Sequence, residues 1–370
     1  MFPARRKSRL RRTLTGLAVM VTTSAVLFVL AEIAVRVFVP ESTFHFLANI
    51  YAPHANPGIA YTVQPGYAGP AFGVPVQANR FGFRGPEWGE QKAPGVFRIA
   101  LIGDSHAFGY GVPFEQGVGE QLVRALEGRA GETRSYEVLN FGVPGYNAAQ
   151  EHAVFEDLAL GFDPDLVVLV PCNNDADPPN SCDAEGWLHS GPTESVGGDQ
   201  TRLQDWRSRS FEEFQTSLFG RSRLLVYLRI QWLRYSYSRE QAQMLGDLEQ
   251  TPALVPDLSG LSDADIPSAL IDEVFEPLNQ ILEVCRDRQL PVVVAGFSNL
   301  PAWNLLFRKL SRDHEVPYLN LLGLFPEVET YADLLRQFSL GWDAHLGPRA
   351  HQRWGTALAE LLDRRGLLGR

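Results

Sequence analysis

Phe-Arg-Ile-Ala-Leu-Ile-Gly-Asp-Ser-His-Ala-Phe-Gly-Tyr-Gly, residues 97–111, passes from a short apolar run into a glycine-rich loop. An apolar run of this length, bounded by glycine, predicts a strand that is buried inside a sheet. Four further runs of the same kind follow along the chain. The five predicted strands are 97–102, 136–141, 165–171, 291–296 and 316–321.

Helical segments separate these strands. The predicted helices are 115–129, 148–160, 272–288, 302–314 and 348–365. Strands that alternate with helices favour a parallel sheet that is covered on both faces. The sequence therefore predicts a flavodoxin-like three-layer α/β/α sandwich with a five-stranded parallel sheet, in a domain that spans residues 96–370.

The loops after residues 102, 141 and 171 are expected to lie side by side, because the carboxyl ends of parallel strands meet at one edge of a sheet. Ser105 stands in the first loop, where its hydroxyl either acts as a nucleophile or caps the following helix. Ala107 stands where a lipase-type G-x-S-x-G elbow has its second glycine. That elbow is therefore absent here.

The second and third loops offer hydrogen-bond donors. Gly145, in Val-Pro-Gly-Tyr-Asn, either presents its backbone N–H at this edge or is an ordinary turn glycine. Asn174, in Cys-Asn-Asn-Asp, either presents its side-chain amide or forms an Asx turn. A donor that is aimed at a developing oxyanion stabilises the transition state by about 3–4 kcal/mol.

Asp343 and His345 lie on a loop before the last predicted helix. A serine needs a base within hydrogen-bond reach to act as a nucleophile at neutral pH. A carboxylate two residues before a histidine is placed to hold the imidazole ring and to set its tautomer. Because this loop follows the last strand, it is expected at the same edge of the sheet as Ser105.

Together the four loops resemble the SGNH hydrolases, also called the GDSL esterase/lipase family. The name-giving residues occur in family order as Ser105, Gly145, Asn174 and His345. The resemblance covers roughly residues 76–362. Its start includes Asn-Arg-Phe-Gly-Phe-Arg-Gly at 79–85, which resembles a lead-in segment of the bacterial, membrane-anchored members.

The resemblance implies a role for each residue. Ser105 would be the nucleophile and His345 the general base and then the acid, with Asp343 orienting the imidazole. The oxyanion hole would consist of the backbone N–H groups of Ser105 and Gly145 and the side-chain amide of Asn174. The implied reaction passes through a tetrahedral intermediate and an acyl-enzyme that water hydrolyses.

Two positions depart from the family pattern. Cys172 begins the third block, where the family usually has glycine, and the last block is one residue shorter than the frequent Asp-x-x-His, with Trp342 at the other Asp position. Shorter spacing also occurs in related acetyltransferases. His106 and His351 are expected to be structural. No H-E-x-x-H or Cys/His cluster is present, so the sequence predicts neither a metal nor a cofactor.

The N-terminus predicts export. Residues 1–12 carry six positive charges and no acid, and no charged residue follows before Glu32. The apolar stretch comes close to the roughly 30 Å hydrocarbon core of a bilayer, and positive residues before a span stay in the cytoplasm. We therefore expect a cytoplasmic tip (1–12) and a single transmembrane signal anchor (13–39) in the cytoplasmic membrane, with the catalytic domain periplasmic or at the cell surface. A cleaved signal peptide is the alternative.

Near the outer end of the predicted span, Glu32 and Arg36 are four residues apart and are expected to pair. Residues 40–95, which are rich in Pro and Gly, are predicted to form a stalk that wraps onto the domain. Residues 176–270 are predicted to be an insertion. Within it, 221–237 has the pattern of an amphipathic helix, which suits a lid, a membrane-surface element or a packed helix.

Cys172 and Cys182 flank a loop rich in Pro, Asn and Asp. An oxidising compartment would let them form a disulfide, and the alternative is two free thiols. Outside the basic tip the chain carries a charge of −16, since the whole chain carries −10. Such an acidic body argues against nucleic acid as a partner.

Three functions are compatible with these residues. The first is an esterase that removes O-acyl groups from a small molecule, an envelope glycan or a lipid. The second is an O-acyltransferase that modifies an extracytoplasmic polysaccharide. The third is a catalytically silent glycan-binding protein. Nothing in the sequence names a particular substrate.

Overall fold

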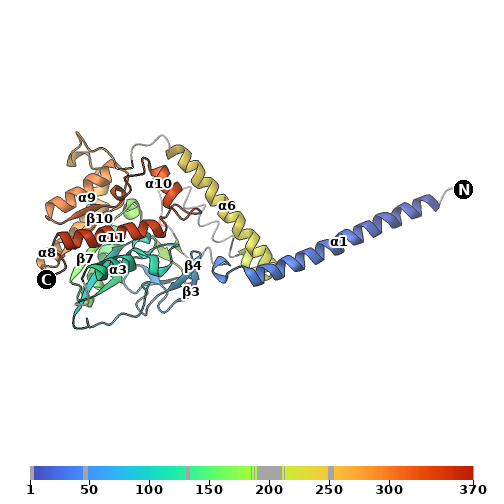
Figure 1. The fold of residues 1–370 in the computed structure, drawn as a ribbon, viewed down its shortest axis with the longest axis horizontal. Coiled ribbons are helices and arrows are strands. Elements are labelled where there is room, and N and C mark those ends of the chain that lie inside the picture. Colours follow the sequence, from blue (N-terminus) through green and yellow to red (C-terminus); the bar gives the residue numbers. More distant parts are fainter. Residues whose placement is uncertain are drawn as a thin grey trace.

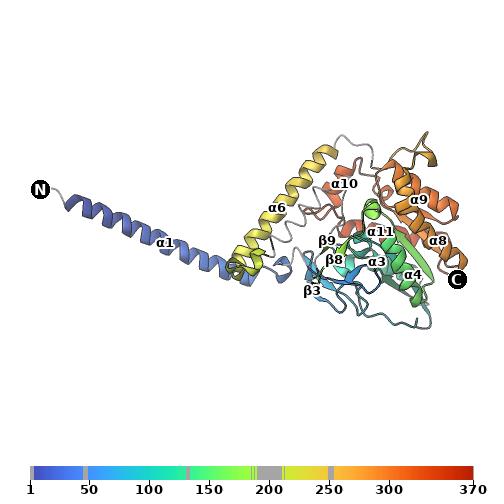
Figure 2. The same cartoon turned by 180° about the vertical axis from the view of Figure 1, so that it is seen from behind.

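A five-stranded sheet lies at the centre of the computed structural model (Figure 1, Figure 2). The structure describes residues 4–44, 49–130, 134–184, 186, 188–189, 211, 213–248 and 254–369. The strands are β5 (Val96–Gly103), β6 (Ser135–Asn140), β7 (Leu166–Val170), β10 (Val292–Gly296) and β11 (Tyr318–Asn320). They lie in the order β11-β10-β7-β5-β6, and each neighbouring pair runs parallel. The predicted flavodoxin-like α/β/α architecture is confirmed.

Helices cover both faces of this sheet, which explains why its strands are apolar at almost every position. Successive side chains of a strand point to opposite faces. In β5, Ala100 and Ile102 belong to one core, and Ile99 and Leu101 belong to the other. All five residues of β7 are buried as well.

The five predicted helices are present with shifted ends. Together with one helix that was not predicted, they place three helices on each face of the sheet. One face carries α4 (Ala148–Asp157), α8 (Glu276–Asp287) and α9 (Pro301–Asp313). The other carries α3 (Val118–Ala130), α10 (Tyr331–Phe338) and α11 (Pro348–Arg364). The unpredicted helix is α10, which is only eight residues long.

Residues 49–95 form two small antiparallel pairs of strands. These are β1 (Tyr51–Pro53) with β2 (Tyr61–Val63), and β3 (Ala68–Ala71) with β4 (Val74–Gln77). Phe83 is fully buried, and its ring lies 5.6 Å from that of Trp88 and 5.1 Å from that of Phe141 at the end of β6. The described part of the predicted stalk thus shares the core of the domain.

The predicted insertion contributes α6 (Arg223–Leu248) and the short pair β8 (Ser181–Cys182) with β9 (Leu188–His189). The rest of this segment is only partly within the described residues. One face of α6 packs against the end of α1 (Ala4–Phe38). The predicted pair within α1 is confirmed, because an Arg36 nitrogen lies 2.7 Å from Glu32 Oε1.

Among the described residues, the part of α1 from Arg11 to Phe38 is the one stretch long and apolar enough to cross a membrane. It projects away from the domain as an isolated helix (Figure 1). A signal sequence near the N-terminus meets the same criteria of length and hydropathy, so the anchor and the cleaved signal peptide are both compatible with this helix.

Replacing Phe83 with alanine tests whether residues 49–95 belong to the core. We expect the free energy of unfolding to fall by about 3–5 kcal/mol, as for other buried phenylalanines. Denaturant unfolding of the detergent-solubilised chain, followed by circular dichroism, measures this change. Leu300→Ala is the control, since Leu300 is 45% exposed, and it should change stability by less than about 0.5 kcal/mol. Equal effects of the two substitutions would contradict a shared core.

Candidate active site

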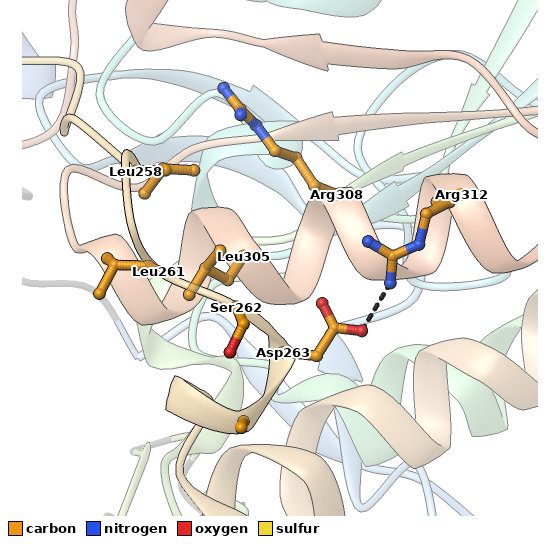
Figure 3. A pocket seen from close by; sticks show the side chains of 8 residues that line it. Leu258, Leu261, Ser262, Asp263, Leu305, Arg308 and Arg312 are labelled. Atoms are coloured by element: carbon orange, nitrogen blue, oxygen red, sulfur yellow. Dashed lines mark hydrogen bonds and ion pairs between the residues drawn. The ribbon is translucent and has the colours of Figure 1, made fainter.

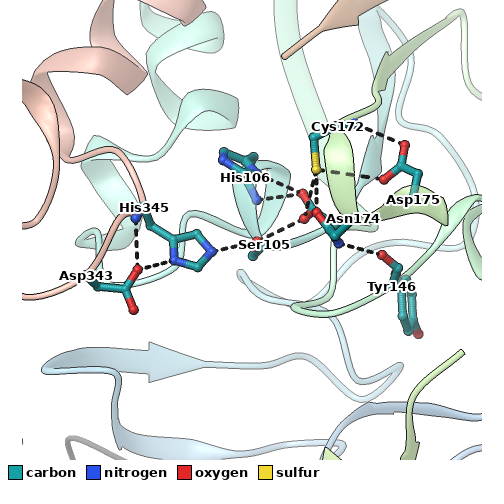
Figure 4. A network of polar contacts seen from close by, with 9 residues as sticks. Ser105, His106, Tyr146, Cys172, Asn174, Asp175, Asp343 and His345 are labelled. Carbon is teal, nitrogen blue, oxygen red and sulfur yellow. Dashed lines mark hydrogen bonds and ion pairs between the residues drawn. The ribbon is translucent and has the colours of Figure 1, made fainter. Parts of the chain in front are cut away.

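Ser105 is the first residue of α2 (Ser105–Phe108), directly after β5. The helix is capped by another residue, because Asp104 Oδ1 accepts a hydrogen bond from the His106 backbone N–H at 2.9 Å. The Ser105 hydroxyl is therefore not needed as a cap. Its Oγ lies 2.8 Å from His345 Nε2, and Figure 4 marks this contact with a dashed line.

The second ring nitrogen of His345 faces a carboxylate. His345 Nδ1 lies 2.5 Å from Asp343 Oδ1, and the same oxygen accepts from the His345 backbone N–H at 2.9 Å. The Tyr110 ring stacks on the imidazole with the centroids 4.4 Å apart. Trp342, at the other Asp position of the motif, instead packs towards α6. Ser105, His345 and Asp343 thus form a hydrogen-bonded triad.

Neighbouring charges decide the protonation of His345. Burial alone would lower the pKa of His345, but the carboxylates of Asp343 and Asp104 outweigh burial and raise the pKa above its usual value of 6.5. Burial would likewise raise the pKa of Asp343, and the adjacent His345 lowers it instead. Asp343 is therefore ionised at neutral pH, and His345 loses its proton at a higher pH than a free histidine does.

The Ser105 hydroxyl has a second acceptor, because its Oγ lies 3.0 Å from Asp104 Oδ2. A hydroxyl has one proton to donate. It donates to His345 when Nε2 is unprotonated and to Asp104 when Nε2 carries a proton. Burial would raise the pKa of Asp104, but His106, and then His345, hold it well below its usual range. Asp104 thus favours the protonated state of His345.

Gly145 and Asn174 lie on the loops after β6 and β7. Gly145 has a φ of +82°, and a Cβ there would stand 2.6 Å from Asn180 Nδ2, so only glycine fits. Asn174 Nδ2 donates to the Tyr146 carbonyl at 3.1 Å. A side-chain amide has two N–H donors, which leaves one for a ligand. The structure brings Asn174 to the same edge of the sheet as Ser105 (Figure 4).

Arg84 holds the far end of α2, and its role was not predicted. The side chain is buried, and its guanidinium donates to the carbonyls of Phe108, Gly109 and Val112 at 3.0, 2.7 and 2.7 Å. Burial lowers its pKa to about 10, so it stays charged. Arg84 belongs to the segment 79–85, which resembles the family lead-in, and its bonds to three carbonyls give that segment a physical role.

Asn140 and Gly142 fix the other side of the same short helix. Asn140 Nδ2 donates to the Ala107 carbonyl at 2.7 Å, and Asn140 Oδ1 accepts from the Gly142 N–H at 2.9 Å. A Cβ on Gly142 would lie 2.7 Å from that of Ala107. The second loop therefore requires glycine here as well, a requirement that the sequence pattern did not reveal.

Two buried acids lie behind the Asn174 loop. Asp175 Oδ2 accepts from the Cys172 backbone N–H at 3.0 Å. Glu151 of α4 is fully buried, and neither of its oxygens accepts a hydrogen bond from a described residue. Burial, and then the nearby Asp175, raise the pKa of Glu151 well above its usual range. Burial therefore favours the protonated form of Glu151, since no described residue donates a hydrogen bond to its oxygens.

Cys172 makes hydrogen bonds within the site. Its thiol lies 3.3 Å from Asp104 Oδ2 and 2.6 Å from Asn174 Oδ1, and it is not paired with Cys182. Of the two alternatives drawn from the sequence, the structure thus has free thiols. Asp104, His106 and Cys172 also bring three possible metal-ligand atoms within 4.8 Å of one another in the described part of the chain. The expected absence of a metal stays a prediction.

A surface cavity of about 550 Å³ lies away from these residues, between the segment 258–264 and α9. Figure 3 shows Arg312 paired there with Asp263, and Leu261 and Leu305 also line the cavity. None of the predicted site residues lines this cavity. It therefore has no part in the arrangement around Ser105.

Comparisons with known proteins gave the following. No protein-family model matches the sequence, and no curated protein matches it. Solved structures that resemble the chain include a lipase/acylhydrolase from Enterococcus faecalis, with 12% identity, coverage of 73% of this chain and 96% of that chain, and a TM-score of 0.40.

Two further structures are an SGNH-hydrolase family esterase and an acetylxylan esterase from Geobacillus stearothermophilus. The first is 14% identical, with coverage of 74% and 98% and a TM-score of 0.33. The second is 13% identical, with coverage of 74% and 94% and a TM-score of 0.36. The structures found thus include members of the family that the four motifs resemble.

The pH dependence of hydrolysis tests the charge arrangement of the triad. A general base must be unprotonated, so kcat/KM should rise with pH with a midpoint above about 6.5. Asp343→Asn removes the carboxylate that raises the His345 pKa. It should move the midpoint to lower pH and reduce the rate on the order of 10⁴-fold. Asp287→Asn, an exposed control, should change neither. An unchanged profile in Asp343→Asn would contradict the triad.

Proposed function

We propose that this chain is a serine esterase of the SGNH type, which cleaves O-acyl esters through an acyl-enzyme. The single observation that supports this function best is the continuous pair of hydrogen bonds from Ser105 Oγ to His345 Nε2 and from His345 Nδ1 to Asp343. A nucleophile, a base and a group that orients the base are the three parts that acyl transfer by serine requires.

The proposed reaction begins when Ser105 Oγ attacks the ester carbonyl carbon and its proton passes to His345 Nε2. The tetrahedral intermediate then collapses, the alcohol leaves, and His345 gives it the proton. His345 next takes a proton from water, which attacks the acyl-serine carbonyl. The second intermediate releases the acid and regenerates Ser105. Asp343 stays ionised throughout and stabilises the imidazolium that forms twice in the cycle.

The negative oxygen of each intermediate would lie among three donors. The Ser105 N–H has no partner within the helix, because it is in the first turn of α2. The Gly145 N–H lies in a turn that only glycine allows, and Asn174 has one amide hydrogen beyond the one that it gives to Tyr146. Donors that are held in place before the reaction lower its barrier without reorganisation.

The substrate we propose is an acyl ester on an envelope glycan or lipid. This choice rests on the proposed location: α1 anchors the chain in the cytoplasmic membrane with its basic tip inside and the catalytic domain outside. Transfer of the acyl group to a sugar hydroxyl is the alternative to hydrolysis. An assay that measures acyl transfer to added sugar acceptors beside release of free acid distinguishes the two.

Fluorophosphonate labelling of the full-length protein tests the nucleophile. The wild type should be labelled, and Ser105→Ala should lose the label together with activity, on the order of 10⁶-fold. Ser298→Ala is the matched control, because Ser298 is also a buried serine just beyond the end of a strand, here β10. A label that survives in Ser105→Ala would contradict the assignment, and the absence of any label would favour a silent binding protein.

Asn174→Ala tests the oxyanion hole separately from the triad. We expect kcat to fall about 10²–10³-fold with little change in KM, because the lost donor acts mainly in the transition state. Asn173→Ala is the matched control, since the neighbouring amide is exposed. Steady-state kinetics on an activated ester measures both. A similar loss in both variants would instead indicate general damage to the loop.

A further inference from the structure

Helices α1 and α6 meet at a hydrogen-bonded junction. Glu32 of α1 accepts from the backbone N–H groups of Arg223 and Leu224, at 3.0 and 2.8 Å. Arg36, one turn further along α1, donates to the Arg221 carbonyl at 3.2 Å. The start of α6 is therefore held against the last turns of α1.

This junction places two large apolar side chains beside the end of α1. The uncharged run of α1 ends at Ala31, so Glu32 is expected where the hydrocarbon core of a bilayer ends. The turn η6 (Leu218–Arg221) is bound to α1 through Arg36 at this level. Within it, Leu218 is 76% exposed and Phe219 is 63% exposed.

Apolar side chains occupy two opposite faces of α6. The face packed against the end of α1 carries Val226, Ile230 and Leu233, which are all buried. A second set has the same spacing of four and three residues, and its members are 52%, 47% and 60% exposed. This outward set is Leu228, Trp232 and Tyr235. A helix that only covered the domain would need apolar side chains on its packed face alone.

The outward set has the composition of a membrane–water interface. Trp and Tyr are enriched there, because their rings are apolar and their N–H or O–H groups reach water. Arg229 lies over the Trp232 ring at 4.5 Å and adds a cation that suits anionic headgroups. Figures 1 and 2 show α6 along the side of the domain from which α1 projects.

We propose that η6 and the outward face of α6 form a lipid-contact surface, which lies in the interfacial layer of the bilayer that α1 crosses. The occupant is the phospholipid surface itself, in continuity with the apolar face of α1. This inference rests on the proposed membrane anchoring by α1.

Contact with lipid would also set the position of the active site. Trp342 packs on the same buried cluster as Val226 and Ile230, and it directly precedes the loop that carries Asp343 and His345. Through Trp342, the helix that would touch the bilayer also packs next to the loop that carries Asp343 and His345. Such a site is held close to the membrane surface, where esters on lipids or on membrane-attached glycans are found.

Depth-dependent fluorescence quenching in proteoliposomes tests the surface. The full-length chain, with Cys182→Ser to remove the accessible thiol, receives one cysteine at a time for an environment-sensitive dye. Phe219→Cys and Leu228→Cys report on the proposed surface, Val26→Cys on the middle of α1, and Leu300→Cys on an exposed apolar position at the start of α9. The vesicles contain phosphatidylethanolamine and phosphatidylglycerol, with nitroxide lipids that quench either near the headgroups or deep in the bilayer.

We expect the Phe219 and Leu228 labels to be quenched mainly by the headgroup-proximal nitroxide, the Val26 label mainly by the deep nitroxide, and the Leu300 label by neither. Quenching at Val26 without quenching at Phe219 and Leu228 overturns the proposed surface and leaves the anchor intact. No quenching at Val26 overturns the anchor and the surface with it. Dyes at Phe219 and Leu228 that are shielded from water but not quenched would indicate a protein partner and also overturn the proposal.

Discussion

The hydrogen bond between Ser105 Oγ and His345 Nε2 joins two residues that are 240 positions apart in the chain. The parallel sheet brings them together. β5 delivers Ser105 to the carboxyl edge of the sheet, and the loop before α11 returns to the same edge with His345. The rest of the site serves this contact. Arg84 and Asn140 hold α2 from two sides, and Asp343 holds the imidazole.

The charged groups around this contact are buried, so each of them needs an opposite charge or a hydrogen-bond partner nearby. Asp343 and Asp104 both favour the imidazolium form of His345, so the protein maintains a base that is stronger than a free histidine. Asp104 also accepts from the Ser105 hydroxyl at 3.0 Å, which gives the resting state an alternative to the reactive pairing. Burial favours the neutral form of Glu151 behind the Asn174 loop, and that form adds no negative charge where the oxyanion would form.

Sequence patterns predicted the strands and the edge where the loops meet, since burial on both faces leaves a strong apolar signal in strands such as 166–170. They did not predict the hairpins of residues 51–77, whose strands are too short to show a period. They also missed Arg84, Gly142 and Glu151. A buried arginine or glutamate is indistinguishable from a surface one until its partners are known, and the need for Gly142 appears only when Ala107 packs against it.

The proposed lipid-contact surface and the proposed active site meet at Trp342, which packs on the α6 cluster and directly precedes Asp343. The proposed chemistry depends first on Ser105 being the nucleophile. Mass spectrometry of the full-length protein, quenched in acid within the first turnover of a nitrophenyl acetate, tests it most directly. We predict an acetyl group on the peptide that contains Ser105, and none in Ser105→Ala. Release of nitrophenol with no acetyl group on Ser105, or with the group on another residue, would contradict the account.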